Sequence, residues 1–251
     1  MQWWVHQAYE NGGIVLLFSW VFWVIGSITL HELSHGWAAL ANGDRTPREL
    51  GHMTLNPVVH MGWMSLVFFA ITGLAWGLMP TDPRRYRHER RGRVLVAAAG
   101  PAMNLAIAVV ALTAIPVWSL LVAKGTIAAA PHTFINVLRF LEIGGFLNLV
   151  LAAFNLLPVP PLDGSAILAG ASRRLDRFYS QPAVQMYGMV VMLLLFFGVV
   201  DVPLQHTMSR AAGTYVRWVS DRLGVAEAEP ARERELEDAN NDRGAAGPTA
   251  D

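Results

Sequence analysis

One stretch of the chain decides its fold class: residues 14–35 read IVLLFSWVFWVIGSITLHELSH. Residues 14–30 carry no charged side chain and are mostly apolar. About 20 such residues are enough for a helix to cross a hydrocarbon core of about 30 Å. The apolar run continues directly into His31, Glu32 and His35. The stretch therefore predicts a membrane helix that carries ionisable residues towards its C-terminal end.

The same apolar pattern recurs along the chain. Only 15% of the 251 residues are charged, whereas soluble domains usually have about 25%. The pattern predicts membrane helices over residues 13–40, 93–124, 134–157 and 182–202. A further apolar segment, residues 58–79, is interrupted by glycines and followed by Pro80. We therefore predict an all-α polytopic membrane protein of about five transmembrane or re-entrant segments, with a small β-hairpin or re-entrant loop near the functional site.

The distribution of arginines predicts the topology. Cytoplasmic loops collect Lys and Arg, and here the basic loops are residues 84–93 and 172–180. If residues 58–79 crossed the bilayer, the first helix and the loop 84–93 would require opposite topologies. A hairpin that enters and returns on one side removes this conflict. We therefore expect residues 58–79 to be re-entrant, and the C-terminal half of the first helix to lie on the cytoplasmic side.

Composition excludes several other functions. The chain has no cysteine, so it forms no disulfide and no thiolate metal site. Its formal net charge is zero, which gives no case for a nucleic-acid partner. Residues 204–223 have apolar positions at helical spacing and arginines between them, which predicts an amphipathic helix on the membrane surface or against the bundle. We expect residues 1–223 to form one membrane-embedded domain and residues 224–251 a disordered tail.

His31 and His35 are spaced for a metal site. Two histidines four residues apart lie on one face of a helix and can bind a single zinc ion, with Glu32 beside it as the base that activates water. In a soluble protein this short motif can occur by chance. In a membrane helix, three ionisable residues within one turn are costly and need a partner.

A third ligand must come from elsewhere in the chain. Among the acidic residues near the other membrane segments, Asp163 stands out, because it follows a long apolar run and lies on the predicted cytoplasmic side. An alternative role for Asp163 is to cap the helix that follows it. The prolines before it and Gly164 after it favour an unwound stretch in which backbone groups are available to a substrate or metal.

These residues form a recognisable signature: the chain resembles the small bacterial branch of the site-2 protease family of intramembrane metalloproteases. The resemblance covers about residues 28–168. It rests on four motifs, which are His-Glu-x-x-His at 31–35, Leu-Asn-Pro-x-x-His at 55–60, Ala-Gly-Pro-x-x-Asn at 99–104 and Asn-x-x-Pro-x-x-Pro-Leu-Asp-Gly at 155–164.

The resemblance implies an intramembrane zinc metalloprotease in a bacterial inner membrane. One Zn²⁺ ion would be bound by His31, His35 and Asp163, with Glu32 as the catalytic base. Its partners would be the lipid bilayer and single-span membrane proteins, which it would cleave in or near their transmembrane segments. An unwound substrate would add to a strand edge at residues 53–55 or 75–80.

Two asparagines of the motifs are candidates for substrate contacts. Asn155 and Asn104 offer amide groups for the substrate backbone or for a developing oxyanion. Their alternative role is hydrogen bonding between helices. A different class of function, a non-catalytic membrane protein that binds clients in the same cavity, is disfavoured because such a protein has no need for Glu32.

Overall fold

The computed structural model describes residues 4–198 and 204–225, and all its regular elements are helical. In chain order they are α1 (Trp4–Ala41), α2 (Thr46–Glu49), α3 (Pro57–Thr72), η1 (Pro83–Arg85), α4 (Glu89–Ala123), α5 (Pro131–Asn155), α6 (Asp163–Ala171), α7 (Arg173–Tyr179), α8 (Pro182–Gly198) and α9 (Gln205–Leu223). The described residues contain no β-strand, so the predicted small β-hairpin is not found among them, and the re-entrant alternative stays a prediction.

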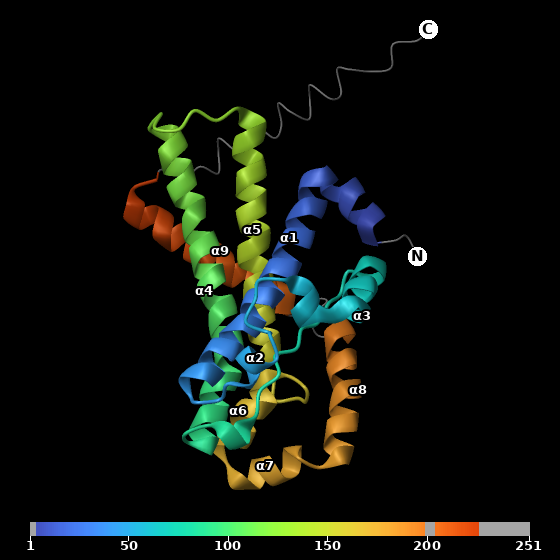
Figure 1. Cartoon of the computed structure of the whole chain (residues 1–251). Helices are drawn as coiled ribbons and strands as arrows, with labels where there is room; N and C mark the ends of the chain where they lie inside the picture. The colour runs from blue at the N-terminus through green and yellow to red at the C-terminus, as the bar shows by residue number, and fades with distance from the viewer. Residues whose placement is uncertain (1–3, 199–203, 226–251) are drawn as a thin grey trace.

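Among the described residues, three helices are each long and apolar enough to cross a membrane: α1 from Gly12 onward, α4 and α5. They pack against one another as the central bundle (Figure 1). Close packing depends on glycines of α5, because a Cβ atom on Gly144 would overlap the ring of Trp23 and one on Gly145 would overlap Leu112. Small residues at such contacts are the usual means by which membrane helices approach each other. Three of the four predicted spans are therefore confirmed.

The predicted re-entrant segment consists of α3 and a return segment without regular secondary structure, residues 74–82. Asn56 caps the start of α3, and Gly73, with a φ of 80°, ends it. The return segment runs back along α3: the hydroxyl of Ser65 accepts from the backbone N–H of Trp76 and donates to its carbonyl, and the N–H of Leu78 donates to the carbonyl of His60.

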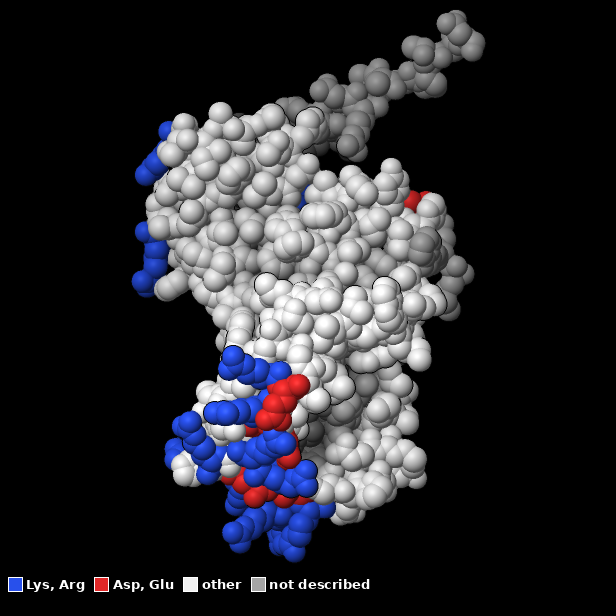
Figure 2. Space-filling view, viewed as in Figure 1, with Lys and Arg blue, Asp and Glu red and all other residues white. Residues whose placement is uncertain are grey.

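The two ends of this hairpin meet at one end of the molecule. The N–H of Arg87 donates to the carbonyl of Asn42, and the N–H of Asp82 donates to the carboxylate of Asp44. The hairpin therefore returns the chain to the end that it left, as the arginine pattern predicts. Figure 2 shows most of the charged side chains on this face gathered at that end, while the broad region above it is largely uncharged.

The C-terminal part differs in detail from the prediction. The fourth predicted span, residues 182–202, corresponds to α8, which is 17 residues long and counts as a span only together with α7, from which it is bent by 76°. Residues 199–202 of that prediction lie outside the described residues. The predicted amphipathic helix is α9, which packs across α4 and α5 and forms a hydrogen bond of 2.9 Å between Tyr215 and Thr113.

The predicted domain boundary falls at the end of α9. Gly224, with a φ of 62°, caps this helix. From residue 226 onward the predicted tail lies outside the described residues, so its disorder stays a prediction.

Candidate active site

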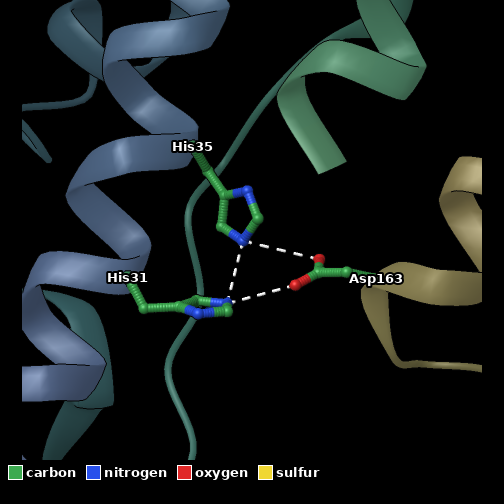
Figure 3. A group of neighbouring side chains, drawn as sticks. All are labelled: His31, His35 and Asp163. Atoms are coloured by element: carbon green, nitrogen blue, oxygen red, sulfur yellow. Dashed lines mark hydrogen bonds and ion pairs between the residues drawn. The ribbon is translucent and has the colours of Figure 1, made fainter. Parts of the chain in front are cut away.

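His31 and His35 lie side by side on the membrane-spanning part of α1. Each is buried, with 8% of its surface exposed. Their Nε2 atoms are 3.0 Å apart, because four residues on a helix bring two side chains onto the same face. The predicted pair is therefore formed, and both rings point away from α1 into the bundle (Figure 3).

Asp163 completes the group from the opposite side. Its Oδ2 atom is 3.2 Å from Nε2 of His31, and its Oδ1 atom is 3.4 Å from Nε2 of His35. The three side chains offer ligand atoms that all lie within 4.8 Å of one another. Asp163 does not cap the helix that follows it, which was its alternative role. Leu162 occupies the N-cap position, and Asp163 is the first residue of α6.

The chain between α5 and α6 sets the position of Asp163. Helix α5 ends at Asn155, and the prolines at 158, 160 and 161 prevent it from continuing. Gly164 then lies against the carbonyls of Leu156 and Leu157, so closely that a Cβ atom there would overlap both. This contact holds the start of α6 against the segment that follows α5. Residues 156–162 are not helical, which confirms the predicted unwound stretch before Asp163.

The hydrogen bonds of the two histidines show which nitrogen atoms are free for a metal. Nδ1 of His35 lies 2.7 Å from the carbonyl of Val96, and because a carbonyl only accepts, Nδ1 carries the proton. Nδ1 of His31 lies 2.6 Å from Oδ1 of Asn104 and is protonated by the same reasoning. In the neutral rings, both Nε2 lone pairs then face each other and a carboxylate.

Such an arrangement of acceptors needs a cation between them. Oδ2 of Asp163 is buried and has no hydrogen-bond partner among the described residues, which fits a ligand that is oriented for a metal. Two imidazoles and one carboxylate are the protein ligands of one class of catalytic zinc sites, in which water or substrate is the fourth ligand. The residues present therefore fit a zinc ion.

Glu32 lies between this group and the return segment of the hairpin. It is buried, with 8% of its surface exposed, and it interacts electrostatically with all three candidate ligands. On its other side, a Cβ atom added to Gly77 would lie 2.5 Å from Oε1 of Glu32. The carboxylate is thus placed where a proton acceptor beside the metal is needed, and the return segment passes directly over it.

The two asparagine candidates have different positions. Asn104 is fully buried, and both ends of its amide are used: Oδ1 by His31, and Nδ2 by a hydrogen bond of 2.9 Å to Oδ1 of Asn148. This placement fits the interhelical alternative and not contact with substrate. Asn155 is partly buried at the end of α5, where its Nδ2 donates to the carbonyl of Leu151, and its role with substrate stays a prediction.

Sequence reasoning missed four contributors to the site. They are the carbonyl of Val96, Asn148, Gly77 and Gly100; a Cβ atom on Gly100 would overlap the rings of both His31 and His35. Asn148 could have been identified from the sequence, because it is a polar residue in an apolar helix. The two glycines lie within stretches already singled out, but a sequence does not show which side chain faces a glycine.

Comparison with known proteins agrees with this geometry. The model of peptidase family M50 matches residues 19–131 and 119–199. The chain is 35% identical over 205 residues to "Putative zinc metalloprotease YwhC" of Bacillus subtilis, covering 79% of this chain and 83% of that protein. It is 27% identical over 230 residues to "Putative zinc metalloprotease Rip2" of Mycobacterium tuberculosis strain H37Rv, covering 87% and 78%.

No solved structure matches the chain. The family match nevertheless extends over most of the described residues and includes His31, His35 and Asp163. Together with the apolar helices, it identifies an integral membrane enzyme. The chain belongs to peptidase family M50 and is a zinc metalloprotease.

Proposed function

We propose that this protein hydrolyses peptide bonds in or near the transmembrane segments of single-span membrane proteins, with one zinc ion bound by His31, His35 and Asp163. The observation that carries the proposal is the position of the three ligands: two of them lie within the membrane-spanning part of α1, and Glu32 lies beside them. The comparison that tests it is a survey of membrane-protein fragments in cells that carry the active protein or its Glu32→Gln variant.

The chain's own groups have separate roles in this reaction. When bound, zinc supplies a Lewis acid that polarises the peptide carbonyl and makes a water molecule more acidic. Glu32 accepts the proton of the attacking water and returns it to the leaving amine. The amide of Asn155, at the end of α5, is the remaining candidate for holding the substrate carbonyl.

The return segment is the surface on which the substrate would bind as a strand. Trp76 and Leu78 use their backbone groups towards α3, whereas the intervening Ala75, Gly77 and Met79 have no backbone hydrogen-bond partner among the described residues. An extended peptide can pair with such an edge. Of the two predicted edges, residues 75–80 are favoured over 53–55, because Gly77 adjoins Glu32 and the carbonyl of Thr54 already accepts from His60.

A small side chain at position 77 tests this arrangement. The Gly77→Ala variant should lose about 10²-fold in cleavage rate, because the new methyl group must displace either Glu32 or the return segment, and misplacing a reacting group by about 1 Å has an effect of that size. Bound zinc, measured by metal analysis, should be unchanged. Cleavage at the wild-type rate would show that the return segment does not lie over Glu32 during the reaction.

We further propose that the protein lies in a bacterial inner membrane with the active site towards the cytoplasm. The support is the set of basic side chains at the end where the hairpin closes (Figure 2). The orientation can be tested cleanly, because the chain has no cysteine of its own.

In intact cells, a membrane-impermeant maleimide should label the Lys124→Cys variant and leave the Arg91→Cys variant unlabelled. Both side chains are exposed, and they lie near opposite ends of α4. Permeabilised cells are the control, in which both variants should react. Labelling of Arg91→Cys alone in intact cells would reverse the proposed orientation.

A further inference from the structure

A chain of buried hydrogen bonds links the candidate zinc site to α5. Nδ2 of Asn104 donates to Oδ1 of Asn148, and Nδ2 of Asn148 donates to Oγ of Ser27 and to the carbonyl of Gly144, both at 2.8 Å. Asn104 and Asn148 are fully buried, and Ser27 is 1% exposed. Since these residues belong to α4, α5 and α1, the chain of hydrogen bonds joins all three spans inside the bundle.

The direction of this chain is fixed at the end far from the metal. The carbonyl of Gly144 only accepts, so Asn148 must turn its NH₂ group towards it. Both hydrogens of that group are then used, one by Gly144 and one by Ser27, and Oδ1 must face Asn104. Asn104 consequently turns its NH₂ group to Asn148 and its Oδ1 to His31.

This direction decides which nitrogen of His31 can bind a metal. An oxygen facing Nδ1 holds the proton there and leaves the lone pair on Nε2, which faces Asp163. If Asn104 were reversed, it would donate to Nδ1 and force the proton onto Nε2. His35 obtains its orientation from the carbonyl of Val96, which cannot be reversed, so only His31 depends on an amide.

We propose that Asn148 is a positioning residue that acts through Asn104 to set the tautomer of His31, and thereby the zinc affinity of the site. The proposal rests on the proposed function, because it requires that His31 binds zinc. Loss of a hydrogen-bond partner of a metal ligand typically lowers metal affinity about 10- to 100-fold. Because Asn148 acts one step further away, we expect about tenfold for its loss.

The test is a double-mutant cycle on zinc affinity, measured by chelator competition with the purified full-length protein carrying Glu32→Gln. Asn104→Leu should weaken zinc binding about 10- to 100-fold, and Asn148→Leu about tenfold. The double variant should bind zinc no more weakly than Asn104→Leu alone, because Asn148 then has no amide left to orient. Asn148→Asp should restore affinity, since its carboxyl oxygen still accepts from Asn104. Visible absorption of bound Co²⁺ should change in Asn148→Leu and return in Asn148→Asp.

Ser19→Ala is the matched control. Ser19 is fully buried on α1, as Ser27 nearly is, but its hydroxyl donates to the carbonyl of Val15 in its own helix. Zinc affinity and the Co²⁺ spectrum should be unchanged in this variant. An equal loss in Ser19→Ala, additive losses in the cycle, or wild-type affinity in Asn148→Leu would each overturn the proposal.

Two further outcomes of these experiments have different meanings. If Asn148→Leu does not fold, Asn148→Asp and Asn104→Leu still test the mechanism. The first keeps an acceptor towards Asn104 and should bind zinc like the wild type, whereas the second removes the oxygen that faces His31. Equal zinc affinity of these two variants would contradict the proposal. If the wild-type protein binds no zinc at all, the proposed metal site itself fails, which differs from the failure of Asn148 alone.

Discussion

Replacing Glu32 with glutamine should abolish detectable cleavage of a membrane-protein substrate while zinc remains bound. Glutamine has nearly the same size as glutamate, so it fits the space between the metal group and Gly77. It cannot accept a proton, and loss of a positioned general base typically lowers a rate by about 10²- to 10⁴-fold. The measurement is the turnover of a purified single-span substrate in detergent or in lipid nanodiscs, with zinc content determined on the same sample.

Zinc content is the decisive control in this experiment. None of the three candidate ligands is altered, so the variant should bind zinc as the wild type does. Loss of both zinc and cleavage would mean that Glu32 supports the site structurally. Cleavage near the wild-type rate would remove Glu32 from the reaction. A variant that still performs the cellular role without cleaving would instead favour the client-binding alternative.

The metal pair could be predicted from sequence because its geometry is local. A helix brings His31 and His35 onto one face whatever the rest of the fold does. Asp163 is different: it lies far along the chain, and spacing alone left it open between a ligand and a helix cap. The predicted topology placed it on the same side as the histidines, and the resemblance of residues 155–164 to a family motif implied a metal ligand. The structure brings its carboxylate to both rings.

The membrane spans were predictable because a bilayer requires about 20 apolar residues per helix. The return of residues 74–82 to the end from which the chain entered α3 was also predictable, since the arginines after Pro80 favour a segment that does not cross. That this segment is re-entrant in a membrane stays a prediction. The bend of 76° between α7 and α8 was not, because a hydropathy pattern records length and not direction.

Contacts between spans were the part that sequence could not provide. The sequence leaves Asn104 open between substrate contact and hydrogen bonding between helices. Its partner Asn148 is on another helix, and no periodicity relates the two. Gly77 and Gly100 are visible in the sequence as residues without side chains. The groups opposite them, Glu32 in one case and two histidines in the other, depend on how the helices and the hairpin pack.

Gly100 provides the sharpest test of that packing. In the Gly100→Ala variant, zinc affinity should fall by about 5- to 150-fold, and cleavage should fall with it at limiting zinc. The reason is steric: the added methyl group would overlap the rings of His31 and His35 on the side that faces α4. Overpacking of this kind costs about 1–3 kcal/mol, and here it is relieved by moving the ligands apart. Chelator competition measures the affinity directly.

Gly26→Ala separates this effect from the general consequences of adding a methyl group to a helix. Gly26 lies in α1, as Gly100 lies in α4, and a Cβ atom added there has nothing within 4 Å. Both changes improve intrinsic helix propensity by about 1 kcal/mol, so neither should weaken its helix for that reason. Gly26→Ala should therefore retain wild-type zinc affinity. If Gly100→Ala also retains wild-type zinc affinity, α4 does not pack against the two histidines in the way that the structure shows. If only Gly100→Ala loses zinc affinity, the close approach of α4 helps to hold the metal ligands in place.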